Sequence, residues 1–136
     1  MRLSKEERDK IKNKFGGKCA YCGCVLPPRW HIDHLEPVVR KSKYIPGRGV
    51  VTKGELWNPD ADNIENMMPA CPACNIDKHS YPLEFWRRQV QDSANILIRN
   101  STTYRRAKRF GLVAETGVQI RFYFEDYKGG DGESGV

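Results

Sequence analysis

Two pairs of cysteines place the tightest constraint on what this chain can fold into. Cys19 and Cys22 form one CxxC pair, and Cys71 and Cys74 form a second pair much further along the sequence. Each CxxC turn presents two thiolates, and Zn²⁺ takes four such ligands in a tetrahedron. We therefore predict a four-cysteine zinc site that joins two distant segments. Because four thiolates leave no open coordination position, this zinc is structural and performs no chemistry.

A redox-active CxxC and a chance spacing are the competing interpretations of these cysteines. A thiol redox protein needs one exposed CxxC in an electropositive site. The second pair, and the Asn75 and Lys78 that follow it, would then be unexplained, and full zinc occupancy would exclude this interpretation. Cys24 is the remaining cysteine. It lies too near Cys22 to be an obvious alternative ligand, so we interpret it as a spare thiol.

Length and composition indicate one globular domain with a polyanionic partner. The chain has 136 residues, of which 39% are hydrophobic, and this suits a single modest core. No apolar run approaches the length of a membrane span, and the start MRLSKEERDK lacks the apolar region of a signal peptide. We expect a soluble, cytoplasmic protein with no membrane contact. The net charge of +6 favours nucleic acid as a partner, although charge alone is weak evidence.

Patterning in the first part of the chain predicts short elements around the cysteines. Residues 4–15 are expected to form a helix, with Ser4 as N-cap and Glu7 completing a capping box. The stretch KCAYCGCVLPPRWHIDHLEP is expected to form a knuckle followed by a β-hairpin. Residues 40–62 are rich in Pro and Gly and basic in their first half, so we expect a long loop, either functional or merely solvated. A short helix should follow the second CxxC and end near Pro82.

The second part of the chain is predicted to be helical and then to form a small hairpin. Apolar residues have helical spacing over 83–98, and residues 102–110 suggest another short helix. LVAETGVQIRFYFE alternates around Glu115-Thr116-Gly117, which predicts a C-terminal β-hairpin. We expect one α+β domain over 1–128, with a core at about 15–82, a basic extension at about 83–128 and a disordered tail over 129–136.

The stretch WHIDHLEPVV gathers titratable side chains in an otherwise apolar run. Asp33 and His34 are adjacent, and His31 lies two residues earlier. In a regular strand neighbouring side chains point to opposite faces, so this pair can serve one site only where a strand ends. Pro37 is consistent with such an end. His31 would share the face of Asp33, either as a supporting or supplementary ligand or as a half-buried spacer.

These features occur in an order that resembles the HNH nuclease family. The matching residues are HIDHLEPVV, ENMMPACPACNIDK and the two CxxC pairs, and they cover about residues 15–78. The resemblance implies a ββα-metal (His-Me finger) core stapled by the four-cysteine zinc site. In addition, YRRAKRFGLV followed by FYFE is similar to the C-terminal extension of small, stand-alone phage-type HNH proteins.

The resemblance implies a metal-dependent endonuclease that hydrolyses DNA phosphodiester bonds. Histidine titrates near neutral pH, so His34 suits the general base that activates water. The carboxylate of Asp33 and the amide oxygen of Asn75 suit a catalytic Mg²⁺ or Mn²⁺. The family analogy also gives Asn66 the task of orienting the loop of the base, and gives products ending in 5′-phosphate and 3′-hydroxyl.

Each of these residues also has an ordinary structural interpretation. His34 can be a hydrogen-bonded core histidine, and Asn66 can cap a turn. Asn75 can be a helix N-cap, a role that is compatible with metal binding. Lys78 can contact a phosphate or simply be solvated. His79 lies four residues after the position at which the family places a terminal histidine ligand, so we do not assign it as one.

A run of basic residues in the extension is the predicted DNA grip. Between residues 87 and 109 a single acid, Asp92, faces many cations. The alternative is a solvated helical face, which charge runs usually are. Side chains that contact phosphates bind DNA without reading its sequence. The residues predicted to make these contacts are Arg87, Arg88, Arg105, Arg106, Lys108 and Arg109.

One metal site in a small monomer would cut one strand at a time, so we expect nicking of duplex DNA with little sequence specificity. A dimer, or two separate visits, would be needed for a double-strand break. The family resemblance fits packaging, recombination or homing, and we place phage genome packaging, with terminase as a partner, first. The competing function is a non-catalytic zinc-ribbon module that binds nucleic acid. It explains the cysteines and the charge, but not Asp33-His34 together with Asn75.

Overall fold

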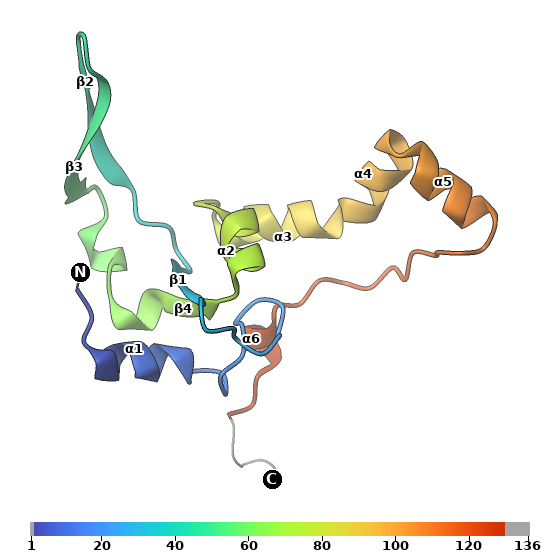
Figure 1. The fold of residues 1–136 in the computed structure, drawn as a ribbon, viewed down its shortest axis with the longest axis horizontal. Coiled ribbons are helices and arrows are strands. Elements are labelled where there is room, and N and C mark those ends of the chain that lie inside the picture. Colours follow the sequence, from blue (N-terminus) through green and yellow to red (C-terminus); the bar gives the residue numbers. More distant parts are fainter. Residues whose placement is uncertain (1, 130–136) are drawn as a thin grey trace. The chain divides into compact units, whose positions relative to one another are not determined.

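The computed structural model describes residues 2–129, which form two compact units (Figure 1). Residues 2–82 and 122–129 belong to the first unit, and residues 83–121 form the second. The elements of the first unit are α1 (Lys5–Lys12), β1 (His31–His34), β2 (Arg40–Ile45), β3 (Gly49–Leu56), η1 (Pro59–Ala61), η2 (Ile64–Asn66), β4 (Met67–Ala70), α2 (Pro72–Lys78) and α6 (Tyr123–Asp126). Those of the second unit are α3 (Leu83–Gln91), α4 (Ser93–Asn100) and α5 (Thr102–Arg109).

Helix α1 begins as its sequence predicts. The hydroxyl of Ser4 accepts a hydrogen bond from the N–H of Glu7, and the Glu7 carboxylate accepts one from the N–H of Ser4, which confirms the capping box. Just beyond the helix, Lys14 Nζ donates to the carbonyls of Ile64 at 2.7 Å and Met67 at 2.6 Å. This lysine ties the end of the first helix to the turn that precedes β4.

The strand carrying Asp33 and His34 pairs with a distant segment. β1 runs antiparallel to β4, in a register that extends from His31 opposite Ala70 to His34 opposite Met67. The hairpin predicted after the first knuckle, with its turn at Pro27-Pro28, is therefore wrong: β1 pairs with β4, and the residues before β1 contribute an isolated bridge between Lys18 and Val25. All four residues of β4 are buried, so the gain from burying this apolar run draws it to β1.

The long basic segment is also different from the prediction, because much of it forms a second hairpin. β2 and β3 are antiparallel and are joined by a turn in which the N–H of Arg48 donates to the carbonyl of Ile45 at 2.9 Å. Pro46 and Gly47 occupy the central positions, and Gly47 has φ 85°, as a type II turn requires. The Pro and Gly residues of this segment had favoured a loop, whereas Pro46 and Gly47 form the turn of a hairpin.

The core of the first unit lies around the first knuckle, residues 19–22, and is completed by residues 122–129, which return to it from the second unit. The N–H groups of Tyr123 and Phe124 donate to the carbonyls of Tyr21 and Ala20. The Tyr21 and Phe122 rings meet edge-on, with their centroids 5.6 Å apart, and Phe122 is buried.

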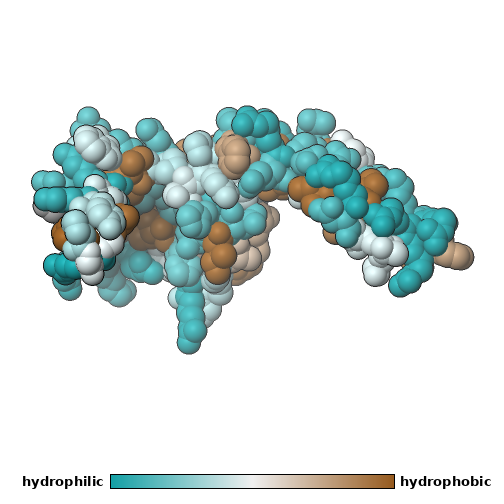
Figure 2. Space-filling model, turned by 90° about the horizontal axis from the view of Figure 1, so that it is seen from above, coloured by the Kyte–Doolittle hydropathy of each residue, from teal (hydrophilic) through white to brown (hydrophobic). Residues whose placement is uncertain are grey.

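In the face shown in Figure 2, hydrophilic residues predominate and hydrophobic ones form small separate patches.

The second unit contains three helices and an extended segment. Residues 83–98, predicted as one helix, divide at Asp92 into α3 and α4, whereas α5 matches the predicted short helix. The predicted C-terminal hairpin is wrong, because no described residue from 112 to 121 is in a strand. Gln91 instead donates to the carbonyl of Val118 and accepts from the N–H of Ile120, and Arg87 donates to the Ile120 carbonyl. Side chains of α3 thus occupy the hydrogen-bonding positions that a second strand would have used.

Helices and small antiparallel sheets together make this an α+β protein, as predicted. In the part of the chain that the structure describes, no helix is both long enough and apolar enough to cross a membrane. The predicted disordered tail lies almost entirely outside the described residues.

Two glycines with left-handed backbone provide a test of how the returning segment packs. A Cβ at Gly23 (φ 80°) would lie 2.8 Å from Tyr123 Cδ1, whereas a Cβ at Gly17 (φ 78°) would meet no atom within 4 Å. We predict that Gly17→Ala lowers the free energy of unfolding by about 1 kcal/mol through backbone strain alone. Gly23→Ala should lower it by roughly a further 1–3 kcal/mol through overpacking, measured by denaturant unfolding. Equal losses would contradict this packing.

Candidate functional site

The four predicted zinc ligands come together. The Sγ atoms of Cys19, Cys22, Cys71 and Cys74 all lie within 4.8 Å of one another. The Sγ atoms of Cys22 and Cys71 are 3.8 Å apart. A tetrahedron with Zn–S bonds of about 2.3 Å has edges of about 3.8 Å, so this separation fits a four-thiolate zinc site. The predicted clustering is confirmed, while zinc as the occupant stays a prediction.

Local hydrogen bonds favour the charged form of one of these sulfurs, that of Cys19. The N–H of Tyr21 donates to Cys19 Sγ, and the N–H of Cys74 donates to Cys71 Sγ, each at 3.4 Å. A hydrogen bond with the Cys74 thiol lowers the pKa of the Cys19 thiol to about 4 and raises the pKa of the Cys74 thiol. Cys24 is exposed and lies outside the cluster of four.

Asp33 is held in a buried polar contact beneath β1. Its Oδ2 lies 3.0 Å from Lys78 Nζ and accepts a hydrogen bond from the Tyr21 hydroxyl. Lys78, in the last turn of α2, has no exposed side-chain surface and also donates to the carbonyl of His34 at 3.0 Å. Burial, and then the Asp33 charge, raise the pKa of the Tyr21 hydroxyl, which therefore stays a donor. The neutral tyrosine and the lysine together offset the desolvation of the carboxylate.

His34 ends β1 and turns to a different partner. Its Nε2 lies 2.9 Å from Oδ1 of Asp62, and both side chains are about a quarter exposed. The hydrogen bond to His34 lowers the pKa of the Asp62 carboxyl, so this group is ionised. A carboxylate on one ring nitrogen fixes the orientation of an imidazole. β1 ends at His34, which agrees with the prediction that Asp33 and His34 can serve one site only where a strand ends.

Asn66 closes the loop that follows His34. Its amide nitrogen donates to the carbonyls of Glu36 at 2.8 Å and Ala61 at 2.7 Å, and its Oδ1 accepts from the N–H of Glu36 at 2.8 Å. Its own carbonyl accepts from the N–H of Leu35 at 2.9 Å. One asparagine therefore fixes the backbone of the turn that follows His34. It also bonds to Ala61, the residue before Asp62, and so links that turn to the segment that carries the Asp62 carboxylate.

Two hollows open on the residues of this site. One, of about 210 Å³, is lined by Asp33 and His34 together with Arg40, His79 and four other residues. The other, of about 290 Å³, is lined by His34, Asp62, Arg40 and six further residues. His34 lines both hollows, as does Arg40.

Some predicted site residues meet at these hollows and others do not. Asp33 and His34 share the smaller hollow, and Asn66 supports the turn beside it. Asn75 is half-buried in α2 and lines neither hollow within the described chain, while His31 is exposed. The metal-ligand role of Asn75 stays a prediction.

The sequence interpretation missed residues that reach the site by long-range packing. Asp62 lies at the end of a segment predicted to be a loop, either functional or merely solvated, and no spacing pattern connects it with His34. His79 lines the smaller hollow because the chain leaves α2 there with φ 54°, a value rare for a residue other than glycine. Its Nδ1 lies 3.0 Å from the Ser80 hydroxyl. Arg40 had been noted only for its charge.

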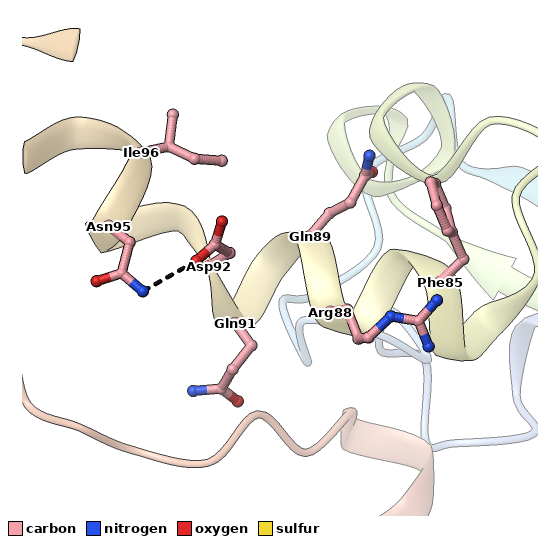
Figure 3. A pocket seen from close by; sticks show the side chains of 7 residues that line it. All are labelled: Phe85, Arg88, Gln89, Gln91, Asp92, Asn95 and Ile96. Atoms are coloured by element: carbon pink, nitrogen blue, oxygen red, sulfur yellow. Dashed lines mark hydrogen bonds between the residues drawn. The ribbon is translucent and has the colours of Figure 1, made fainter. Parts of the chain in front are cut away.

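The predicted DNA-contacting cations of the second unit are partly engaged within that unit. Arg87 pairs with Glu84, Lys108 pairs with Glu115, and Arg105 donates to the carbonyls of Ile98 and Arg99. Arg88 lines an open hollow of about 600 Å³ along α3 and α4, where Asn95 donates to Asp92 (Figure 3). That hollow contains no histidine or cysteine.

This is a small α+β protein with an antiparallel β1–β4 pair and an adjacent Asp-His pair at the end of β1. Its four clustered cysteines are placed to hold a metal ion, and one of them lies in α2 and another at the N-cap of that helix. No family model matches the chain. No solved structure matches it either. A curated protein of Bacillus subtilis (strain 168), "SPbeta prophage-derived putative HNH endonuclease YoqL", is 34% identical over 77 residues, or 57% of this chain. The chain is therefore similar to a protein whose name contains the family that its motifs resemble. The match spans 30% of the length of this relative.

The buried pair of Asp33 and Lys78 should be essential for stability. Lys78→Met removes the charge at similar volume and leaves the Asp33 carboxylate buried without a cation, so we predict a loss of about 3–5 kcal/mol of unfolding free energy. The double variant Asp33→Asn with Lys78→Met should lose less than Lys78→Met alone. Lys5→Met, at a side chain 87% exposed, is the control and should change stability little. A Lys78→Met protein as stable as the Lys5→Met protein would contradict this role.

Metal removal gives a second prediction for this region. Cys71→Ser should abolish stoichiometric zinc and strongly lower thermal stability, because metal-binding energy contributes to folding. Cys24→Ser should retain one zinc per chain. The measurements are elemental analysis and thermal unfolding with and without a chelator. Retention of zinc by the Cys71 variant, or its loss from the Cys24 variant, would show that the ligand set is different.

Proposed function

We propose that this protein is a metal-dependent HNH endonuclease that hydrolyses DNA phosphodiester bonds. The observation that carries the proposal is the placement of Asp33 and His34 on one hollow, with His34 held by the Asp62 carboxylate and its loop closed by Asn66. The named Bacillus relative and the clustered cysteines support it. On this proposal β1, β4 and α2 are the ββα-metal core, and the zinc is structural.

His34 is the proposed general base that takes a proton from the attacking water. A general base needs a fixed ring and access to the substrate. The contact with Asp62 fixes the imidazole, and the two hollows that His34 lines provide access. We assign Asp62 as a positioning residue for this base, in the way that a buried carboxylate orients a catalytic histidine elsewhere.

Asp33 and Asn75 are the proposed ligands of a catalytic Mg²⁺ or Mn²⁺. Both described contacts of the Asp33 carboxylate are made by Oδ2, so Oδ1 is the atom that we assign to the cation. The donors are hard oxygens, which these ions prefer. Such an ion supplies Lewis-acid stabilisation of charge on the phosphate and the leaving oxygen. Lys78 and Tyr21 hold the carboxylate in place.

The remaining parts of the proposal concern how the enzyme works on DNA. We propose a monomer that chiefly nicks duplex DNA with little sequence preference and that functions in the cytoplasm of a host cell. Arg88, Arg106 and Arg109 are the strongest remaining candidates for phosphate contacts in the second unit, because the other three predicted cations have partners within it. Genome packaging beside a phage terminase is the biological setting that we place first.

A non-catalytic zinc-ribbon module that binds nucleic acid is the second candidate function. The observation that favours it is the buried contact of Asp33 with Lys78 and Tyr21, which gives this aspartate a structural role without any metal. A binding module does not explain why His34 is partly exposed or why the Asp62 carboxylate holds its ring.

Cleavage of supercoiled plasmid tests the proposal. With Mg²⁺ or Mn²⁺ the native protein should convert supercoiled DNA to the nicked circle. His34→Ala should lose about 10²-fold or more of this rate, because the base is removed. His31→Ala is the matched control, since His31 is exposed on the same strand, and its rate should be nearly unchanged.

Zinc content must be equal in all three proteins, so that misfolding is not mistaken for lost chemistry. A native protein that is fully loaded with zinc and binds DNA, yet leaves the plasmid intact, would instead favour the binding module.

A further inference from the structure

The β2–β3 ribbon, with the turn that joins its strands (the basic hairpin, residues 40–56), has both faces in water. Tyr44 and Val50 lie opposite each other in the ladder and are 67% and 71% exposed. A two-stranded ribbon on its own is at best marginally stable in water. An apolar cross-strand pair left exposed on such a ribbon suggests that a partner covers it.

Charge identifies what kind of partner the basic hairpin fits. Residues 40–56 include Arg40, Lys41, Lys43, Arg48 and Lys53 against a single acid, Glu55. Arg40, Lys43 and Arg48 are exposed, and Lys41 lies over the exposed Trp57 ring at 4.9 Å. Across the described chain, no ion pair involves any of the four cations from Arg40 to Arg48. The partner complementary to this surface is a polyanion.

The basic hairpin starts at the site itself. Arg40, its first residue, lines both hollows beside His34. From there the ribbon projects away from β1 and β4 (Figure 1). Its shorter strand, β2, has six residues, which corresponds to roughly 20 Å. Cations are therefore distributed from the edge of the site outward along one narrow element.

The second unit is a weaker candidate for the same task. Three of its six predicted DNA-contacting residues, Arg87, Arg105 and Lys108, already bond to groups within that unit. The four cations from Arg40 to Arg48 have no such neutralising partners in the described chain. Arg40, which lines both hollows with His34, thus belongs to an element that sequence patterning had suggested was a loop.

We propose that the basic hairpin is a DNA-gripping arm that lies in a groove of duplex DNA beside the phosphate to be cut. A two-stranded ribbon has the width that the major groove admits. Lys43 and Arg48 contact backbone phosphates, and the Tyr44–Val50 pair covers the groove-facing side. The position of the cut relative to the arm rests on the proposed nuclease function, whereas DNA binding by the arm does not.

The salt dependence of binding tests the arm without any cleavage. All proteins carry His34→Ala, and binding to a short DNA duplex is measured without divalent cations over a series of salt concentrations. The double reversal Lys43→Glu with Arg48→Glu should reduce the magnitude of the slope of log K against log salt by about 2, and should weaken binding at least tenfold. Lys43→Arg with Arg48→Lys keeps both charges and should keep both values.

A matched reversal on α5, Arg106→Glu with Arg109→Glu, should have the smaller effect. Zinc content and thermal stability should be unchanged in every variant, because the substituted side chains are exposed. An unchanged slope in the hairpin reversal, or a larger effect of the α5 reversal, overturns the arm.

The outcome for the arm is separate from that for the nuclease. Plasmid nicking by the native chain, together with an unchanged slope in the hairpin reversal, removes the arm alone. A reduced slope together with a native protein that never nicks removes the nuclease and leaves the arm as a DNA-binding element.

Discussion

The contact on which the rest of this structure depends is the meeting of two CxxC turns from distant parts of the chain. It places the first knuckle against the start of α2, and so determines where the other end of that helix lies. Lys78 then reaches beneath β1 to pair with Asp33, and Tyr21, between two of the cysteines, donates to the same carboxylate. A four-sulfur cluster therefore positions an aspartate that none of its sulfurs contacts. The same cysteine cluster therefore holds the fold of the first unit together and sets the geometry of its polar site.

Features that depend on neighbours in sequence could be predicted, and features that depend on distant packing could not. The cysteine spacing and the capping box of α1 are local patterns, and the clustering of the cysteines and the capping box are both confirmed. The partner of β1 was missed because β4 is only four residues long and lies beyond a long insertion. The C-terminal hairpin was wrong because alternation cannot reveal that Gln91 supplies the hydrogen bonds of a missing strand.

The site shows the same division. Asp33 and His34 stood out because two titratable residues interrupt an apolar run, and they do reach one hollow. The carboxylate of Asp62 joins His34 only through the turns that precede β4, so no spacing rule could have indicated it. Asn66 was singled out by the resemblance, and the structure gives its side chain a concrete set of backbone contacts. Among the described residues Asn75 has no comparable side-chain contact, so its assignment rests on the resemblance alone.

The position of the basic hairpin, inserted between the two strands of the β1–β4 ladder, has a consequence for how such a chain can change over time. The register of that ladder is maintained by the cysteine cluster, by Asn66 and by Lys14, none of which belongs to the insertion. Lengthening a connecting segment costs only about 0.6 kcal/mol for each doubling of its length. Apart from Arg40, Gly54 and Leu56, which line the larger hollow, the insertion can therefore be shortened, extended or replaced while Asp33 and His34 keep their places in β1. A scaffold of this kind can exchange the tip of one ribbon while the hollows beside Asp33 and His34 stay the same.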